Sequence, residues 1–148
     1  MNQWKELRKR QKEEISKLPI YWAFTDESFD KLLVKLGLTR ENYEDHLCAA
    51  FGGVILKKDR EAMEEMFRRH DQELKDAIAS DPTGDGIIFD MFYSELIANE
   101  YGYTGAYGDT LQSLGFTMAD IKEDPRLLHG LEEAAEMIMR EEEDADGC

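Results

Sequence analysis

Apolar residues recur every three or four positions in three segments of the chain, which predicts three amphipathic helices. The first helix runs from Asn2 to Leu18 and is ended by Pro19. The second begins near Asp59 and ends before Asp81-Pro82, and the third covers Arg126 to about Glu143. The expected core stripe of this last helix is made of Leu128, Leu131, Ala135 and Ile138.

Shorter apolar runs lie between these helices. Residues 20–24 and 54–57 are short, apolar and bounded by turn residues, which predicts two buried strands. From Gly86 to Tyr101, ten of sixteen residues are apolar or aromatic, so this segment is expected to be the central helix of the fold. The glycine-rich segment 102–108 that follows is expected to be a loop.

Two turns share one chemistry. In 36–39 (Leu-Gly-Leu-Thr) and 114–117 (Leu-Gly-Phe-Thr), a glycine can end one helix in the left-handed conformation and a threonine can cap the next. The first turn predicts a helix that ends at Leu36 and a second short helix that reaches about Ala50, with 48–51 as its packed apolar end.

These elements predict an α+β fold that is mostly helical, with about six or seven helices and one small two-stranded β element. A chain of 148 residues has the size of one domain, expected over residues 1–143. The acidic residues 144–148 are expected to form a disordered tail. No apolar run approaches the roughly 20 residues that span a bilayer.

Charge is divided unequally along the chain. Residues 1–75 contain 15 basic and 15 acidic residues, whereas residues 76–148 contain 3 basic and 18 acidic residues. Such a negative field repels nucleic acid and anionic membranes, so we expect neither as a direct partner. The expected partner is a basic protein. Cys48 and Cys148 form no disulfide framework, which favours the cytoplasm.

Two groups of residues are candidates for partner binding. The tyrosines of 101–107 offer large amphipathic contact surfaces, although they would also fit folded back onto the core. The last helix is dense in glutamate, and residues one turn apart lie about 6 Å from each other, near the spacing of phosphates along a nucleic acid strand. The candidates are Tyr101, Tyr103, Tyr107, Glu132, Glu133, Glu136, Glu141, Glu142 and Glu143.

Two simpler explanations of the charge on the acidic helix stay open. It would serve solubility alone if it were a solvated face with no partner. The basic N-terminal helix would also reduce its field, by packing against it in the monomer or across a homodimer.

The sequence gives little support for a metal or cofactor site. The loop that starts at Asp81 follows part of a calcium-loop pattern, but Phe92 stands where a bidentate glutamate is needed. Asp81 and Asp85 are therefore weak calcium candidates and are expected to cap the central helix instead. His46 and Cys48 lack the paired spacing of structural zinc ligands. We expect no metal and no cofactor.

The alternative to a binding protein is a small enzyme or ligand-binding protein. Its pocket would lie near Asp90, Glu95 and His129. Asp90 and Glu95 are five residues apart on one helix, so their side chains diverge by about 140°. No catalytic residue is therefore predicted. A further alternative is a structural or assembly module.

Three segments carry a family resemblance. They are LPIYWAFTDESFDKLLVKLGL (18–38), the Gly-Gly pair with its short strand (52–57), and MFYSELIANEYGYTGAYGDTLQSLGF (91–116) followed by DPRLLHGLE (124–132). In this order the chain resembles an uncharacterised family of small acidic proteins associated with phages and mobile elements of gut Firmicutes. The resemblance implies a genomic setting and no established activity.

Charge and resemblance together predict a non-enzymatic, phage-associated protein that binds a basic partner through its acidic surface. The sharpest form of this hypothesis is a nucleic-acid mimic that inhibits a host defence nuclease, of the anti-CRISPR or anti-restriction type. The partner would then be a nucleic-acid-binding enzyme.

Overall fold

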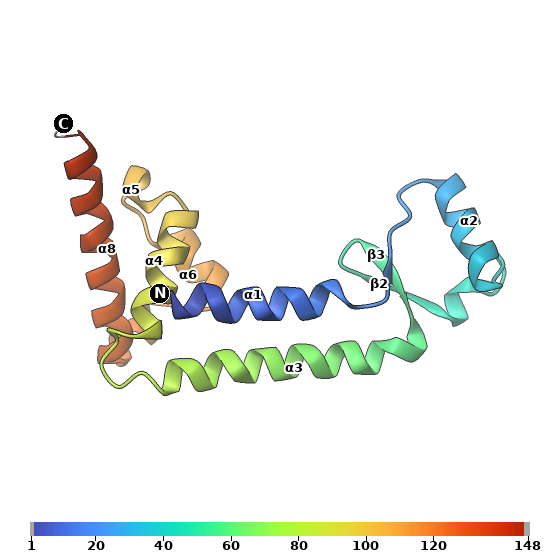
Figure 1. The fold of residues 1–148 in the computed structure, drawn as a ribbon, viewed down its shortest axis with the longest axis horizontal. Helices are drawn as coiled ribbons and strands as arrows, with labels where there is room; N and C mark the ends of the chain where they lie inside the picture. Colours follow the sequence, from blue (N-terminus) through green and yellow to red (C-terminus); the bar gives the residue numbers. More distant parts are fainter. Residues whose placement is uncertain (1, 147–148) are drawn as a thin grey trace. The chain divides into compact units, whose positions relative to one another are not determined.

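The structure is a computed structural model that describes residues 2–146 (Figure 1). Its contacts group the chain into two compact units: unit 1 comprises residues 1–12 and 73–148, and unit 2 comprises residues 13–72. Cys148 lies outside the described residues. The single domain expected over 1–143 stays a prediction.

The predicted fold class is confirmed: the described chain is mostly helical, with one small antiparallel sheet. Eight α-helices, one 3-10 helix and three strands occur in residues 2–146. They are α1 (Gln3–Ser16), β1 (Ile20–Tyr21), α2 (Asp26–Leu36), η1 (Tyr43–Asp45), β2 (Leu47–Ala50), β3 (Gly53–Leu56), α3 (Lys57–Ala79), α4 (Ile87–Ala98), α5 (Tyr101–Thr104), α6 (Gly108–Leu114), α7 (Met118–Glu123) and α8 (Pro125–Asp146).

The sheet of unit 2 has the order β1-β3-β2, and β3 is antiparallel to both neighbours. Gly53 allows β1 and β3 to approach, because a Cβ at this position would lie 2.6 Å from the Tyr21 carbonyl oxygen. Strand β3 contains most of the expected strand 54–57. Of the expected buried strand 20–24, only Ile20 and Tyr21 form β1, and they are partly buried, whereas Trp22 and Phe24 are exposed. Strand β2 is a third strand.

The prediction of a short helix that reaches Ala50 is wrong. Only η1 forms in that stretch, and residues 47–50 are strand β2, paired from Leu47 with Leu56 to Ala50 with Gly53. The turn between β2 and β3 has positive φ at Phe51 (52°) and Gly52 (84°), as a two-residue hairpin turn requires. Because phenylalanine rarely adopts a positive φ, the sequence at this turn does not indicate a hairpin.

The glycine turns behave as predicted where helices end. Gly37 and Gly115 both have left-handed backbones, and the following residues donate N–H groups to carbonyls inside the preceding helix. Thr117 caps α7 in a capping box with Asp120, and Thr25 caps α2 in the same way with Ser28. Thr39 is followed by turns and η1 rather than by a regular helix.

The core of unit 1 is built around α4, as the sequence predicted. Its Ile88, Met91, Phe92 and Leu96 are fully buried. On one side α4 packs against α8, through the buried stripe that contains Leu127, Leu131, Ala134, Ala135 and Ile138, with Leu128 partly buried beside it. Figure 1 shows α4 between α8 and the start of α1, whose Trp4 and Leu7 are buried in the same core.

Several boundaries differ from the expected ones. The central helix α4 ends at Ala98 rather than at Tyr101. Residues 101–104 form the short helix α5, so that only 105–107 of the glycine-rich segment 102–108 remain irregular. Helix α8 continues through Asp146, so residues 144–146 are helical rather than a disordered tail. No helix within residues 2–146 is both long and apolar enough to cross a membrane.

Candidate functional site

The acidic face of α8 consists of Glu132, Glu133, Glu136, Glu141, Glu142 and Glu143. All six residues are exposed, because α8 buries the opposite stripe against α4. The amphipathic pattern of the helix thus separates its apolar residues from its carboxylates. The structure places the six predicted glutamates on the surface of unit 1, where a partner can reach them.

The row of carboxylates on this face is short. Glu132 and Glu136 lie one turn apart, but Arg140 occupies the next turn and its guanidinium pairs with Glu136 at 3.1 Å. Met137, which is 40% exposed, adds an apolar side chain to the same surface. The face therefore offers separate carboxylates rather than a long row at the spacing of phosphates.

Glu141 is held in place by unit 1 itself. The Tyr93 hydroxyl donates to its carboxylate, whose two oxygens lie 2.8 and 2.7 Å from the hydroxyl oxygen. This hydrogen bond, together with partial burial and the nearby charge, raises the pKa of Tyr93. Glu141 is thus fixed to the edge of α4.

Helix α1 does not neutralise the acidic face by ion pairing. Its Lys5, Lys9, Arg10 and Lys12 are exposed, and no salt bridge joins α1 to α8 within residues 2–146. Unit 1 contains 9 basic and 20 acidic residues in the sequence, and unit 2 contains 9 and 13. The negative charge is therefore concentrated in the unit that carries the acidic face.

Asp90 and Glu95, two of the residues near which the enzyme alternative places its pocket, both bond to the first turn of α1. The Asp90 carboxylate accepts the Gln3 backbone N–H at 2.8 Å, and the Glu95 carboxylate accepts the Trp4 indole N–H at 3.1 Å. His129 is instead bonded to Asp85. The structure thus gives these three residues separate structural partners.

The three candidate tyrosines have different environments. Tyr101 is 8% exposed and stacks on Tyr107, with ring centroids 5.2 Å apart. Burial, followed by the hydrogen bond with Tyr101 and the charges of Tyr101 and Glu132, raises the pKa of Tyr107 to about 12. Tyr103 is 92% exposed. Of the three, Tyr103 is exposed, Tyr107 is partly buried and Tyr101 is buried.

Tyr103 and Glu142, which the sequence placed in two different candidate groups, line one pocket. The pocket has a volume of about 420 Å³ and lies where the end of α4, α5 and the last third of α8 meet. Its other lining residues are Ile97, Glu100, Gly102 and Ile138. We call it the Tyr103 pocket.

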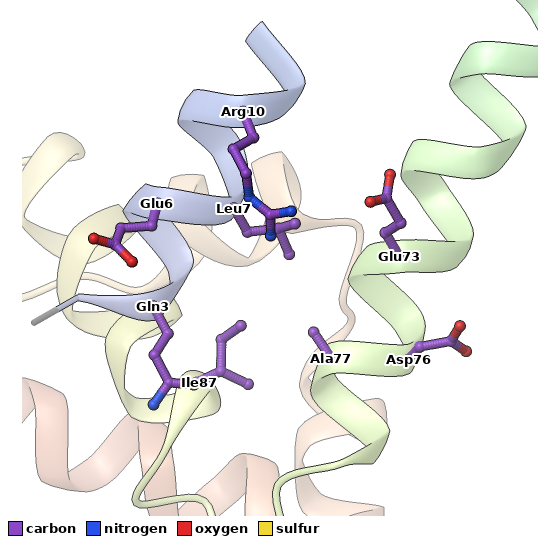
Figure 2. A pocket seen from close by; sticks show the side chains of 8 residues that line it. All are labelled: Gln3, Glu6, Leu7, Arg10, Glu73, Asp76, Ala77 and Ile87. Carbon is purple, nitrogen blue, oxygen red and sulfur yellow. The ribbon is translucent and has the colours of Figure 1, made fainter. Parts of the chain in front are cut away.

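A second hollow lies between the start of α1 and the end of α3, within unit 1 (Figure 2). It has a volume of about 430 Å³, and Leu7, Ala77 and Ile87 supply its apolar lining. Figure 2 shows Arg10 extending from α1 into this space. The hollow carries charges of both signs, since Arg10 is basic and three other lining residues are acidic: Glu6, Glu73 and Asp76. The remaining lining residue, Gln3, is neutral. Such a mixed lining selects no single class of charged ligand.

The weak calcium candidates Asp81 and Asp85 have structural roles. Asp81 is buried, and its carboxylate accepts backbone N–H groups from Thr83, Gly84, Gly86 and Ile88 at 2.9 to 3.1 Å. Burial alone would raise the pKa of Asp81, but these four donors outweigh it and lower the pKa. Asp81 therefore holds the entry to α4, as expected, whereas Asp85 bonds to His129.

Arg126 closes the same loop from α8. Its guanidinium donates to the carbonyls of Ile78 and Asp81, at 3.1 and 2.7 Å, and also to the Asp124 carboxylate. The Arg126 guanidinium is thus bonded to the end of α3 and the loop after it, so it does not neutralise the acidic face.

Comparison with protein families relates most of the chain to a family. Residues 3–137 match a family of unknown function, DUF7659. The chain belongs to this family. Searches of the curated proteins and of the solved structures gave no match. Membership is consistent with the expectation of an uncharacterised family, and it assigns no activity to the surfaces described above.

Sequence reasoning missed the Tyr103 pocket. Glu100 stood out as an acidic residue, but Ile97, Gly102 and Ile138 gave no sign of a shared site. The one local signal is the run of Glu100, Tyr101 and Gly102 directly after an apolar helix, which predicts an abrupt change of chain direction.

The bond between His129 and Asp85 predicts a pH dependence. The hydrogen bond to Asp85, aided by the charges of Asp85, Glu133 and Glu132, raises the pKa of His129. The pair therefore contributes its full stability below the unfolded pKa of about 6.5, and loses it as the pH rises through the folded pKa. NMR titration should give a higher His129 pKa in the wild type than in Asp85→Asn. Equal values would show that the pair does not form.

Proposed function

We propose that the chain is a binding protein whose acidic face on α8 engages a basic protein surface. The observation that supports this proposal most directly is the shortage of cations in the half of the chain that contains the face. Residues 76–148 contain only Lys122, Arg126 and Arg140 as basic residues. Arg126 is bonded to Asp124 and to the end of α3, and Arg140 to Glu136. A partner with exposed lysine and arginine would supply the missing positive charge.

The narrower proposal concerns the kind of partner. A nucleic-acid-binding enzyme of the host has a basic surface, and its inhibition in the cytoplasm fits the phage setting that the sequence resemblance implies. The interruption of the carboxylate row by Arg140 limits mimicry to the short stretch around Glu132 and Glu136. We therefore propose electrostatic competition for a basic surface rather than the copying of an extended strand.

Charge reversal on the face tests the proposal. Glu132→Lys/Glu133→Lys/Glu136→Lys should weaken binding to a short polylysine peptide by about tenfold or more at low salt, because three attractions become repulsions. Raising the ionic strength to about 0.3 M should weaken wild-type binding steeply. Fluorescence anisotropy of the labelled peptide measures both effects.

A matched control has the same change in net charge elsewhere. Glu41→Lys/Glu44→Lys/Asp45→Lys replaces three exposed acids in unit 2. It should weaken binding much less than the α8 variant. Equal loss in the two variants would mean that net charge, and not the face, attracts the peptide. A pull-down from host lysate with the same pair of variants, with and without competing duplex DNA, then tests the nucleic-acid-binding class of partner.

A further inference from the structure

We propose that the Tyr103 pocket receives an arginine side chain of the basic partner. This inference rests on the proposed function, and it names the one side chain that the partner inserts. Three features of the pocket support it: its lining, the lack of a cation within the chain, and the geometry of its two carboxylates.

The lining combines three kinds of surface. Ile97, which is 49% exposed, and Ile138 form an aliphatic wall, and the exposed ring of Tyr103 supplies an aromatic face. The carboxylates of Glu100 and Glu142 come from different elements, the turn before α5 and the end of α8. A ligand that matches all three needs an apolar stem and a cationic end.

The backbone brings the two carboxylates into one pocket. Glu100 has a left-handed backbone, with φ of 58°, which turns the chain from α4 into α5. Glu142 then reaches the backbone of α5, where a Cβ on Gly102 would lie 2.9 Å from its Oε1 atom. Glycine at 102 therefore lets the Glu142 carboxylate lie directly against α5.

The chain supplies no cation to these carboxylates. Within residues 2–146, neither Glu100 nor Glu142 takes part in a salt bridge, and the nearest arginine in sequence, Arg140, pairs with Glu136. Two carboxylates beside an exposed tyrosine form a site of one sign, in contrast to the mixed charges of the hollow in Figure 2. Charge complementarity thus favours a cationic ligand.

Arginine fits this lining better than lysine does. Its planar guanidinium stacks on an aromatic ring and still donates hydrogen bonds to carboxylates at its edge. Its methylene groups would lie along Ile97 and Ile138, whereas a lysine ammonium offers a point charge without a stacking surface. A pocket of about 420 Å³ leaves room for the side chain and accompanying water.

The test uses the full chain and a short lysine-rich peptide with a single central arginine. Replacing that arginine by lysine should weaken binding about three- to fivefold, and replacing it by neutral citrulline should weaken it further. Tyr103→Ala and Glu142→Gln should each remove the preference for arginine over lysine. Because both side chains are exposed, neither substitution should unfold the protein.

Glu143→Gln is the matched control, since it removes the same charge from the neighbouring exposed position outside the pocket. It should keep the preference for arginine. Equal preference for arginine and lysine in the wild type, or equal effects of Glu142→Gln and Glu143→Gln, would overturn the pocket assignment. If the triple variant of Glu132, Glu133 and Glu136 still weakened binding in that case, the proposed function would stand without the pocket. If the triple variant did not weaken binding either, the pocket assignment and the proposed function would both be wrong.

Discussion

Asp81→Ala is expected to destabilise unit 1 by about 3 kcal/mol, because one carboxylate serves four backbone donors. The substitution removes both oxygens that accept the N–H groups of Thr83, Gly84, Gly86 and Ile88. Those at Gly84 and Ile88 lie in buried surroundings, so water cannot fully replace the carboxylate. The loop would lose the group that fixes its conformation before α4.

Tryptophan fluorescence can follow unit 1 alone. The sequence has two tryptophans, of which Trp4 is buried in unit 1 and Trp22 is half exposed in unit 2. In a Trp22→Phe background, urea unfolding monitored through Trp4 should show the loss for Asp81→Ala. Asp85→Ala, at an exposed position of the same loop, should change the free energy of unfolding by no more than about 1 kcal/mol. Equal effects would refute the role given to Asp81.

Acid should reduce the difference between Asp81→Asn and the wild type. The pKa of Asp81 is lowered in the folded protein, so its contribution is present above the unfolded pKa of about 3.9. That contribution is lost as the pH falls through the folded pKa. The two proteins should therefore differ most near neutral pH and converge at strongly acidic pH in the same urea assay.

Gly130→Ala is expected to destabilise unit 1 by about 2 kcal/mol through overpacking. A Cβ at this position would lie 2.6 Å from the Ile88 Cγ2 atom and 2.9 Å from the Gly84 carbonyl oxygen. Ile88 is fully buried and the Gly84 oxygen is backbone, so neither moves easily. The clash should exceed the gain of about 1 kcal/mol that alanine brings to a helix interior.

Gly108→Ala is the control for this substitution. Gly108 begins α6 and has no atom within 4 Å of the position of an added Cβ. Its replacement should change the free energy of unfolding by about 0.5 kcal/mol or less. Hydrogen exchange at the amides of α4 and α8 should accelerate in Gly130→Ala and stay unchanged in Gly108→Ala. A Gly130→Ala protein as stable as the wild type would contradict the close packing of these helices.

Local chemistry explains the parts of the fold that could be predicted. Gly37 and Gly115 end helices, and Thr117 begins one, because these residues satisfy backbone groups within a few positions of themselves. The central helix was recognisable because its residues are apolar on every side. These features need no knowledge of distant neighbours.

Strand β2 could not be predicted because its conformation depends on a neighbouring strand rather than on its own residues. Its sequence, Leu-Cys-Ala-Ala, contains no β-branched residue and is equally suited to a helix, so pairing with β3 decides its conformation. The tyrosines show the same dependence on packing. Tyr101 and Tyr103 are two residues apart, yet α5 turns one ring into the core and the other into solvent.

The division of the chain also has a consequence for its synthesis. Unit 2 is one continuous segment, residues 13–72, inserted between the two parts of unit 1. On the ribosome it is complete before α4 and α8 have been made, and it can fold first. Trp4 and Leu7 end up in the core of unit 1, whose next buried residue along the chain is Ile87. The Trp4 indole bonds to Glu95, 91 positions further along. The first turns of α1 are therefore made before α4 and α8 but are buried only after these two helices have been made.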